Sequence, residues 1–207
     1  MKRLASQRGF TLMEMLVATF IFIIAMTIVL DIFMLAQRAQ RKAVAYERIQ
    51  ADTRYIVNKI ADETRDGTLD YSYYTTAGIA IDSANGNDVL AIKTFNGKTL
   101  LFQVSDAAGT FCANPTDITS KPCLLQSDDG GATWAQSSSK GTSIERLHFY
   151  ISPDKSPFVI NPATNDYDVS EQPLVRMVVD MKGTITSTTG VVRMQTQTSF
   201  ATREYKR

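Results

Sequence analysis

The chain has 207 residues, 44% of them hydrophobic and 21% charged. This composition suits a globular domain and excludes a disordered chain, a collagen and a cysteine-dense mini-protein. The net charge is +1, but without Lys2, Arg3 and Arg8 the chain has 19 basic against 21 acidic side chains. That balance gives no overall reason to bind nucleic acid. One His and two Cys argue against a His-based or Cys-rich metal site, and we expect no metal and no cofactor.

A long apolar stretch follows a short basic segment. Residues 1–9 are basic and polar, and Phe10 to Leu30 is a run of 21 mostly apolar residues. As a helix this run would span about 32 Å, close to a bilayer core of about 30 Å. It is longer than the apolar region of a secretory signal peptide, and no A-x-A cleavage site follows it. We expect a transmembrane helix over residues 10–35, with its orientation left open because basic residues flank both ends.

Glu14 is unusual for its place near the start of the apolar run. An ionised carboxylate well inside a bilayer costs about 2.5–3.5 kcal/mol, so such a residue is a candidate functional group. The alternative is a carboxylate at the level of the lipid headgroups that has no role.

The segment Arg8-Gly9-Phe10-Thr11-Leu12-Met13-Glu14 resembles the N-terminal signature of type IV pilins and type II secretion pseudopilins. In that family a prepilin peptidase cuts after the Gly that ends a basic leader. The new N-terminal residue, usually Phe, is N-methylated, and a Glu stands at the fifth mature position. Gly9, Phe10 and Glu14 match these positions, and the resemblance covers residues 1–35.

The resemblance implies cleavage between Gly9 and Phe10, N-methylation of Phe10 and a role for Glu14 in assembly. In a filament, the Glu14 carboxylate would pair with the Phe10 amine of a neighbouring subunit and favour one axial register. The implied partners are other pilin or pseudopilin subunits, the prepilin peptidase, the inner-membrane assembly platform and membrane lipid. As a substrate of the peptidase, the chain is not expected to be an enzyme.

The resemblance also implies a location. We expect a single-pass protein of the inner membrane, with its C-terminal domain periplasmic or extracytoplasmic, which enters a filament on assembly. Many major pilins carry Gly and Pro in the membrane helix, but neither occurs between residues 10 and 66 of this chain, so we expect an unkinked helix. Asp31 is interpreted as a charge at the membrane surface, with a salt bridge to a neighbouring subunit as the alternative.

Residues 36–66 are expected to continue the helix as an amphipathic segment. Ile49, Ile56 and Ile60 fall on one stripe, and the helix is expected to end near Gly67. The stripe needs a partner, which the strands that follow can supply. Lying on a membrane surface is the alternative, and the mixed charge of the other face disfavours it.

Residues 67–207 change to a period of two with Gly, Asn and Asp turns, which predicts a β-rich domain. Asn96-Gly97 is a strong hairpin signal. The expected strands are Val89–Phe95, Thr99–Val104, Leu124–Ser127, Thr133–Ser137, Ser143–Ser152, Leu174–Lys182 and Val191–Thr202. The expected loops are 68–87, 105–121 and 153–172. The predicted fold class is α+β, a long N-terminal helix followed by an antiparallel sheet, which is what pilins build. The predicted domain organisation is therefore a leader over residues 1–9, a transmembrane helix over 10–35, an amphipathic continuation over 36–66 and a β-rich domain over 67–207.

The last third carries a weaker resemblance. Residues 144–152, 172–183 and 192–204 look like the C-terminal sheet of minor pseudopilins, with the J-type of type II secretion nearest. Size and strand pattern therefore favour a minor subunit.

Cys112 and Cys123 lie in a polar loop, with ten residues between them. If the domain lies outside the cytoplasm, a disulfide is expected, and closing so short a loop would contribute about 3 kcal/mol. Two free thiols are the alternative.

Residues Ser127 to Trp134 match the Asp-box pattern S-x-D-x-G-x-T-W, which resembles turns in sialidases and other β-propellers. The pattern occurs once, in a chain too short for a propeller. We therefore predict a structural role, in which the Asp organises a hairpin turn and the Trp packs beneath it. Direct glycan binding is the alternative.

His148 lies on an expected strand, where Ile144, Arg146, His148 and Tyr150 would share one face. No nucleophile motif accompanies it, so an ordinary surface or edge residue is expected. Two acidic clusters could hold calcium, with solvated turns as the alternative. These clusters are Asp128 with Asp129, and Asn165 with Asp166 and Asp168.

Two other functions stay open from the sequence. One is a filament-associated module for adhesion or DNA uptake, which the acidic balance of the mature chain disfavours. The other is a membrane-anchored extracytoplasmic enzyme, which the scarcity of His and Cys disfavours.

Overall fold

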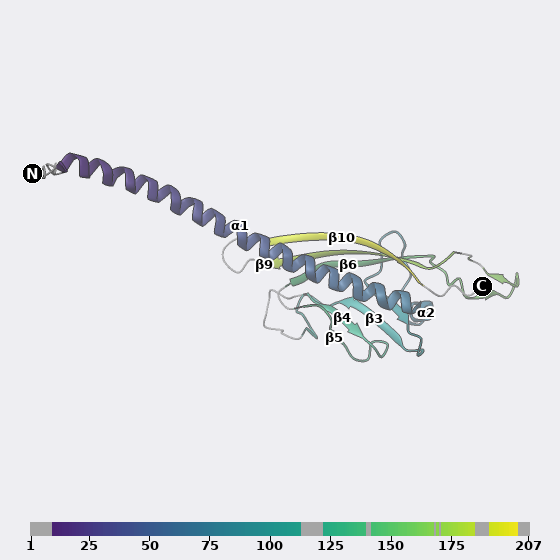
Figure 1. The fold of residues 1–207 in the computed structure, drawn as a ribbon. Coiled ribbons are helices and arrows are strands. Elements are labelled where there is room, and N and C mark those ends of the chain that lie inside the picture. Colours follow the sequence, from purple (N-terminus) through teal and green to yellow (C-terminus); the bar gives the residue numbers. More distant parts are fainter. Residues whose placement is uncertain are drawn as a thin grey trace, which may run out of the picture. The chain divides into compact units, whose positions relative to one another are not determined.

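The computed structural model describes residues 10–112, 122–139, 142–167, 169, 171–184 and 191–202. The fold is α+β, as the sequence predicted: a long helix is followed by antiparallel strands (Figure 1). The chain divides into two units, Met1–Ala43 and Val44–Arg207. The helix α1 (Leu12–Asp66) contributes to both units, which are described separately below.

The described elements after α1 are one short helix and ten strands. In chain order they are β1 (Thr68–Leu69), α2 (Tyr71–Ala77), β2 (Val89–Lys93), β3 (Thr99–Val104), β4 (Leu124–Ser127), β5 (Ala135–Gln136), β6 (Thr142–Ser152), β7 (Ile160–Asn161), β8 (Asp166–Tyr167), β9 (Leu174–Thr184) and β10 (Val191–Ala201).

The first unit is helical from Leu12 on. No Gly or Pro interrupts α1, and the helix runs from Leu12 without a break, as expected. It is long and apolar enough to cross a membrane, and none of its most apolar 18 residues is buried. The apolar side chains in this stretch are therefore not covered by the described part of the chain.

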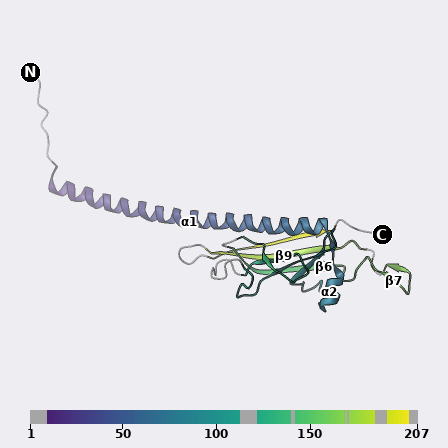
Figure 2. The same ribbon diagram turned by 90° about the horizontal axis from the view of Figure 1, so that it is seen from below.

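The second unit begins with the part of α1 from Val44 on, which lies along the three-stranded sheet (Figure 2). Ile49, Ile56 and Ile60 are fully buried, which confirms the predicted apolar stripe. Thr53 lies on the same stripe and donates its hydroxyl to the Ile49 carbonyl at 2.7 Å, so its polar group is satisfied inside the core. The same hydroxyl lies 3.0 Å from Met181 Sδ of β9.

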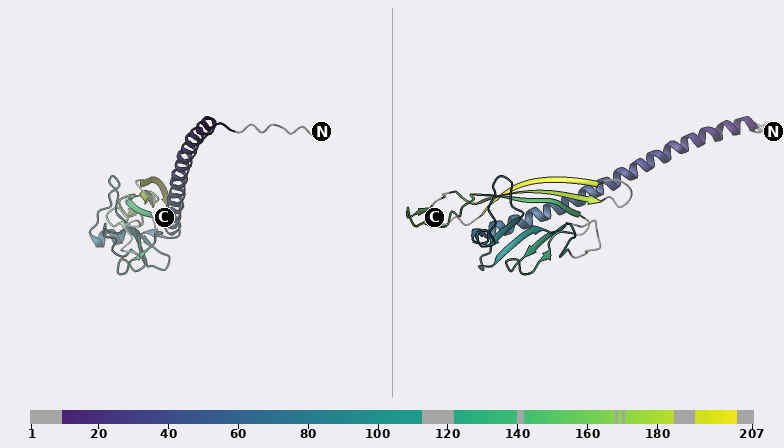
Figure 3. Two further views of the ribbon diagram at one scale, coloured as in Figure 1. Left: turned by 90° about the vertical axis from the view of Figure 1, so that its left-hand side faces the viewer. Right: turned by 180° about the vertical axis from the view of Figure 1, so that it is seen from behind.

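Two antiparallel sheets follow, with strand orders β1-β2-β3-β4-β5 and β10-β9-β6. Asn96-Gly97 joins β2 to β3, as its hairpin signal predicted, and Gly97 has a φ of +77°, which glycine adopts without strain. In the second sheet, β9 pairs along its whole length with β10 on one side and over most of it with β6 on the other. β10, drawn in yellow, lies at the edge of this sheet (Figure 3).

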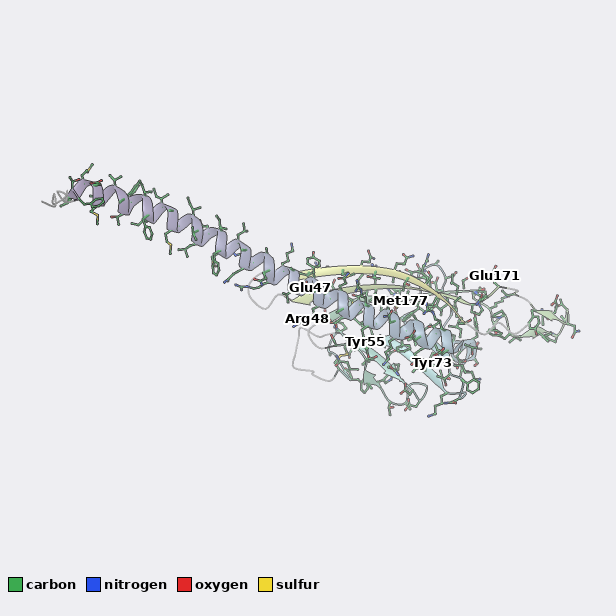
Figure 4. The ribbon with its side chains drawn as sticks, viewed as in Figure 1. Glu47, Arg48, Tyr55, Tyr73, Glu171 and Met177 are labelled. Carbon is green, nitrogen blue, oxygen red and sulfur yellow. A yellow bond between two sulfur atoms is a disulfide. The ribbon has the colours of Figure 1, made fainter. Side chains whose placement is uncertain are left out.

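A main core joins these elements, and Cys112, Cys123 and Leu125 form a second, smaller cluster. Buried side chains from α1, α2 and both sheets form one cluster. Surface and core side chains can be compared in Figure 4: Tyr55 of α1 is half exposed, whereas Met177 of β9 is fully buried in the core.

The expectation of a loop over residues 68–87 was wrong, because β1 and α2 lie within it. Asp70 caps α2 by accepting the Tyr73 N–H at 3.2 Å, and Gly78 ends it with a φ of +68°. The helix has the sequence YSYYTTA, whose aromatic and Thr residues have low helix propensity. The caps and the buried Tyr74 therefore stabilise a helix that periodicity does not predict.

The predicted face of Ile144 was also wrong. Ile144 is fully buried on the side of Leu147 and Phe149, instead of sharing the exposed face of Arg146. The register between β6 and β9 shifts between Ile144 and Arg146, which marks a β-bulge. The extra residue reverses the alternation of faces, and a strict period of two cannot foresee it.

Other details of the predicted elements differ as well. β2 ends at Lys93, so Phe95 lies in the turn, where it is 95% exposed. The expected loop 153–172 contains the two-residue strands β7 and β8. α1 ends before Gly67 as expected, but this glycine has no positive φ; a Cβ there would lie 2.5 Å from Ile92 Cγ2, so close packing requires glycine.

Candidate functional site

Glu14 lies in the first turn of α1. The Thr11 carbonyl accepts the Met15 N–H at 3.2 Å, and the Thr11 hydroxyl oxygen accepts the Glu14 N–H at 3.2 Å. Thr11 is therefore the N-cap of the helix, and Glu14 occupies its third position. The T-x-x-E spacing of a capping box was visible in the sequence and was missed.

The Glu14 carboxylate is exposed beside the helix N-terminus, whose unpaired N–H groups favour a negative charge. Phe10 is also exposed, directly before the capping residue. Among the described residues, the structure records no ion pair for Glu14. Gly9 and the rest of the predicted leader lie outside the described residues. The arrangement leaves the carboxylate accessible to a cation from another molecule.

Asp31 is the second carboxylate of the apolar stretch. It lies in the interior of α1 and is exposed. It lacks the position in the first turn that distinguishes Glu14, so it provides a matched comparison for that residue.

Cys112 and Cys123 form a disulfide, as the sequence analysis predicted, with Cα atoms 6.0 Å apart. Both cysteines are buried. Ser105 is bound to the bridge at several points: its Oγ accepts the Cys123 N–H at 3.0 Å and lies 3.3 Å from Cys112 Sγ. The bridge is thus fixed to Ser105, the residue directly after β3, and sequence spacing does not reveal this contact.

The Asp-box forms the turn between β4 and β5. Asp129 accepts the Thr133 N–H at 2.9 Å, the Thr133 hydroxyl at 2.6 Å and the Ser127 hydroxyl at 2.7 Å. These bonds, led by the Thr133 hydroxyl, hold the pKa of Asp129 well below its usual range. The Asp therefore organises the turn, as predicted.

Trp134 packs beneath this turn, again as predicted. It is partly buried and contacts both the main core and the cluster of Cys112, Cys123 and Leu125. The Asp-box turn and the disulfide, which are separate motifs in the sequence, therefore stabilise one corner of the domain.

His148 lies on the outer face of β6 and is partly buried. Its Nδ1 is 2.9 Å from Asp88 Oδ1, although the two atoms do not meet hydrogen-bond geometry. Because a neutral imidazole carries no charge, the contact is an ion pair only when His148 is protonated. Asp88 is exposed to solvent. No cysteine, serine or metal-ligand set accompanies His148 in the contacts described, and the residue fits the expected surface position.

The acidic clusters take part in turns. Asp129 makes the bonds given above, and Asp166 accepts the Tyr167 N–H at 2.7 Å. Asp168 lies outside the described residues. Within the part of the chain that the structure describes, no group of three His, Cys, Asp or Glu side chains is placed to hold a metal ion.

Two adjoining grooves of about 750 and 380 Å³ lie beside α2 and share four lining residues, Tyr71, Thr75, Ser156 and Val159. Burial alone would raise the pKa of Asp70 in the larger groove, but hydrogen bonds from Ser72, Thr99 and the Tyr73 N–H lower it below its usual value. This carboxylate therefore stays ionised as the helix cap. Neither groove has a His or Cys among its described lining residues.

Comparison with models of protein families gives a match for the N-terminal segment. Residues 4–30 match the family model described as the prokaryotic N-terminal methylation motif. The chain therefore carries a prepilin-type N-terminal motif, which indicates a type IV pilin-like or pseudopilin-like protein, and the motif implies a processed subunit that assembles with others of its kind. With the apolar helix, it indicates a membrane anchor followed by a C-terminal domain. No curated protein and no solved structure gave a match.

Proposed function

We propose that this chain is a minor subunit of a type IV pilus or of a type II secretion pseudopilus, nearest to the J-type of the latter. A prepilin peptidase cuts after Gly9, Phe10 becomes the N-methylated terminus, and residues 10–35 anchor the chain in the inner membrane. The observation that carries the proposal is the match of residues 4–30 to the methylation motif, which leads into an apolar helix with Glu14 in its first turn.

Glu14 is proposed to join subunits. An ionised carboxylate within a bilayer costs about 2.5–3.5 kcal/mol on insertion scales, and a cationic partner offsets this cost. The described residues of the chain provide no such partner, whereas the Phe10 amine of a neighbouring processed subunit would do so. Pairing of these two groups would fix the axial register between subunits.

The domain is proposed to lie on the extracytoplasmic side of the membrane. The Cys112–Cys123 disulfide supports this orientation, because disulfides form and persist mainly in oxidising compartments. The partners in this setting are other pilin or pseudopilin subunits, the peptidase, the assembly platform and lipid.

Intact mass and N-terminal sequencing of the chain from membranes, with and without the prepilin peptidase, would test the processing. The expected product begins at N-methylated Phe10 only when the peptidase is present. A chain that still begins at Met1 beside an active peptidase would contradict the proposal.

The Glu14→Ala variant tests the assembly step, and Asp31→Ala is its control. Glu14→Ala should be processed normally and stay in the membrane, but it should be lost from sheared filaments or from cross-links to neighbouring subunits. Asp31→Ala removes a carboxylate from the same helix and should assemble. Normal assembly of the Glu14 variant, or equal loss in both variants, would refute this role of Glu14.

A further inference from the structure

The stretch of α1 that directly follows the apolar run carries cations and no acid. Arg38, Arg41 and Lys42, called the basic patch below, lie within five residues, and no Asp or Glu occurs from residue 32 to residue 46. The rest of α1, from residue 47 to residue 66, carries five acidic and four basic residues. Basic residues without acidic neighbours are therefore concentrated beside the proposed membrane span.

The three cations of the basic patch are neighbours on the surface of the helix. Residues three and four apart in sequence lie side by side on an α-helix, so Arg38 adjoins both Arg41 and Lys42. All three side chains are exposed, and Arg41 donates to the Gln37 side chain at 3.1 Å. Within the part of the chain that the structure describes, neither Arg38 nor Lys42 forms an ion pair. Like charges at this spacing repel each other, so a bound anion would stabilise the patch.

The two nearest acidic residues do not neutralise the basic patch. A helix turns by about 100° per residue, which places Glu47 on the opposite side of α1 from Arg38. Asp31 precedes Arg38 by seven residues, or about 10 Å along the helix axis. No ion pair joins these two residues in the described structure. The anion that the patch attracts is therefore expected from outside the chain.

The position of the basic patch indicates which anion this is. Leu35 ends the apolar run, and Arg38 and Lys42 follow it by about 4.5 and 10.5 Å along the axis. Side chains of a helix lean toward its N-terminus, which here is the end proposed to lie in the membrane. The headgroup layer on each side of a bilayer is about 5–7 Å thick. The leaning side chains therefore bring their charges to the level of the lipid phosphates.

We propose that the basic patch is a binding site for the phosphate of anionic phospholipids, such as phosphatidylglycerol. Arg38 and Arg41 donate paired N–H groups to the phosphate oxygens, and Lys42 adds a compact positive charge. The inference rests on one part of the proposed function, the membrane anchor over residues 10–35. It depends neither on cleavage nor on assembly, and it holds for whichever leaflet adjoins the patch.

Native mass spectrometry of the full chain in a non-ionic detergent tests the site, with phosphatidylglycerol and phosphatidylcholine of the same acyl chains as probes. The unmodified chain should bind phosphatidylglycerol with the lower dissociation constant. Replacing Arg38, Arg41 and Lys42 together by Gln should reduce this preference by about tenfold or more, because each cation near an anionic surface contributes about fivefold. Gln has a helix propensity close to those of Arg and Lys, so α1 should stay intact.

The matched control replaces Arg48, Arg54 and Lys59 together by Gln. It removes the same charge from the same helix outside the basic patch, so it should keep the preference for phosphatidylglycerol. An excess of glycerol 3-phosphate should not displace the bound lipid, because the soluble phosphate lacks the acyl chains that hold the lipid beside the apolar helix. This competition distinguishes a lipid site from a site for free phosphates.

Equal dissociation constants for the two lipids, or an equal loss of preference in the patch and control variants, would overturn the inference. Displacement by glycerol 3-phosphate would also overturn it. A patch variant that keeps its lipid preference but loses cross-links to neighbouring subunits would show a protein contact instead. A chain found in the soluble fraction would refute the membrane anchor and the lipid site together. Failure of cleavage at Gly9 or of assembly through Glu14 would leave the lipid preference unchanged.

Discussion

The two parts of α1 face different surroundings. In the part before Val44, none of the most apolar 18 residues is buried, and apolar side chains occur all around the helix. In the part from Val44 on, apolar residues form one stripe, and Ile49, Ile56 and Ile60 on it are fully buried against the domain. The helical geometry is the same, so the difference lies in what each part can pack against.

This difference distinguishes a segment whose partner is in the chain from one whose partner is not. A stripe suits a helix that lies on a protein core, whereas a helix that is apolar on all sides suits lipid or other helices. The carboxylate of Glu14 follows the same logic, because its proposed partner is another subunit. Changes in the two parts of α1 should therefore be detected by different measurements.

The largest expected effect contrasts Ile56→Ala with Ile23→Ala. Truncating the buried Ile56 should lower the free energy of unfolding of the domain by about 2–5 kcal/mol, because the cavity adds to the lost apolar burial. Ile23 is exposed, so the same change there should leave the domain's stability unaltered. Urea unfolding of the full chain in detergent, followed by Trp134 fluorescence, checks both, since the only Trp lies in the domain.

A charge at position 23 tests the part of α1 that is proposed to span the membrane. Ile23→Arg places a cation near the middle of the proposed span and should cost about 2.5–3.5 kcal/mol of insertion on translocon scales. The chain should shift from the membrane fraction to the soluble fraction, with an unchanged Trp134 unfolding curve. Equal loss of domain stability in the Ile23 and Ile56 variants would contradict the division.

The strands could largely be predicted from the sequence, because their signals are local. Asn96-Gly97 and the Asp-box each define a hairpin within a few residues, and the period of two places the strands beside them. α2 could not be predicted in the same way. Its caps, Asp70 and Gly78, were present in the sequence, but its seven residues carry no helical stripe. The bulge that moves Ile144 depends on pairing with β9, which no local pattern contains.

The candidate site shows the same limit. The motif alone drew attention to Gly9, Phe10 and Glu14, and two cysteines permit only one intramolecular pairing. The Thr11 cap could have been inferred from the T-x-x-E spacing. The packing of Trp134 on the cluster that contains the disulfide could not, because it joins residues that only the tertiary fold brings together.

A smaller effect is expected where the buried stripe of α1 meets β9. A Cβ at Gly183 would lie 2.7 Å from Ile49 Cδ1, closer than side chains pack. Gly183→Ala should therefore destabilise the domain by about 1–3 kcal/mol, as overpacked cores do. The Ile49→Val change removes that methyl group, so the double variant should lose less stability than the sum of the two single changes, again measured by Trp134 fluorescence.

Gly97→Ala is the control for this pair. A Cβ at Gly97 meets nothing within 4 Å, and its cost arises from the φ of +77° alone. The loss of stability in the Ile49→Val, Gly97→Ala double variant should therefore equal the sum of the two single losses. If Ile49→Val reduces the destabilisation caused by both glycine substitutions equally, the contact between α1 and β9 is not what makes Gly183→Ala destabilising.

The smallest expected effect concerns pH, and it too should be confined to the domain. Hydrogen bonds from Thr133 and Ser127 lower the pKa of Asp129 in the folded state. A carboxylate with a depressed pKa contributes stability above its unfolded pKa of about 4, and this contribution is lost as the pH falls through the folded value. Asp129→Asn should therefore be less stable than the unmodified chain at pH 7, and the difference should shrink as the pH falls below about 4.

Asp128→Asn, which changes the neighbouring carboxylate without touching the bonds to Thr133, should leave that pH dependence in place. Urea unfolding from pH 7 to pH 2, followed by Trp134 fluorescence, measures both variants, and a constant Asp129→Asn difference over this range would show that ionised Asp129 does not stabilise the turn.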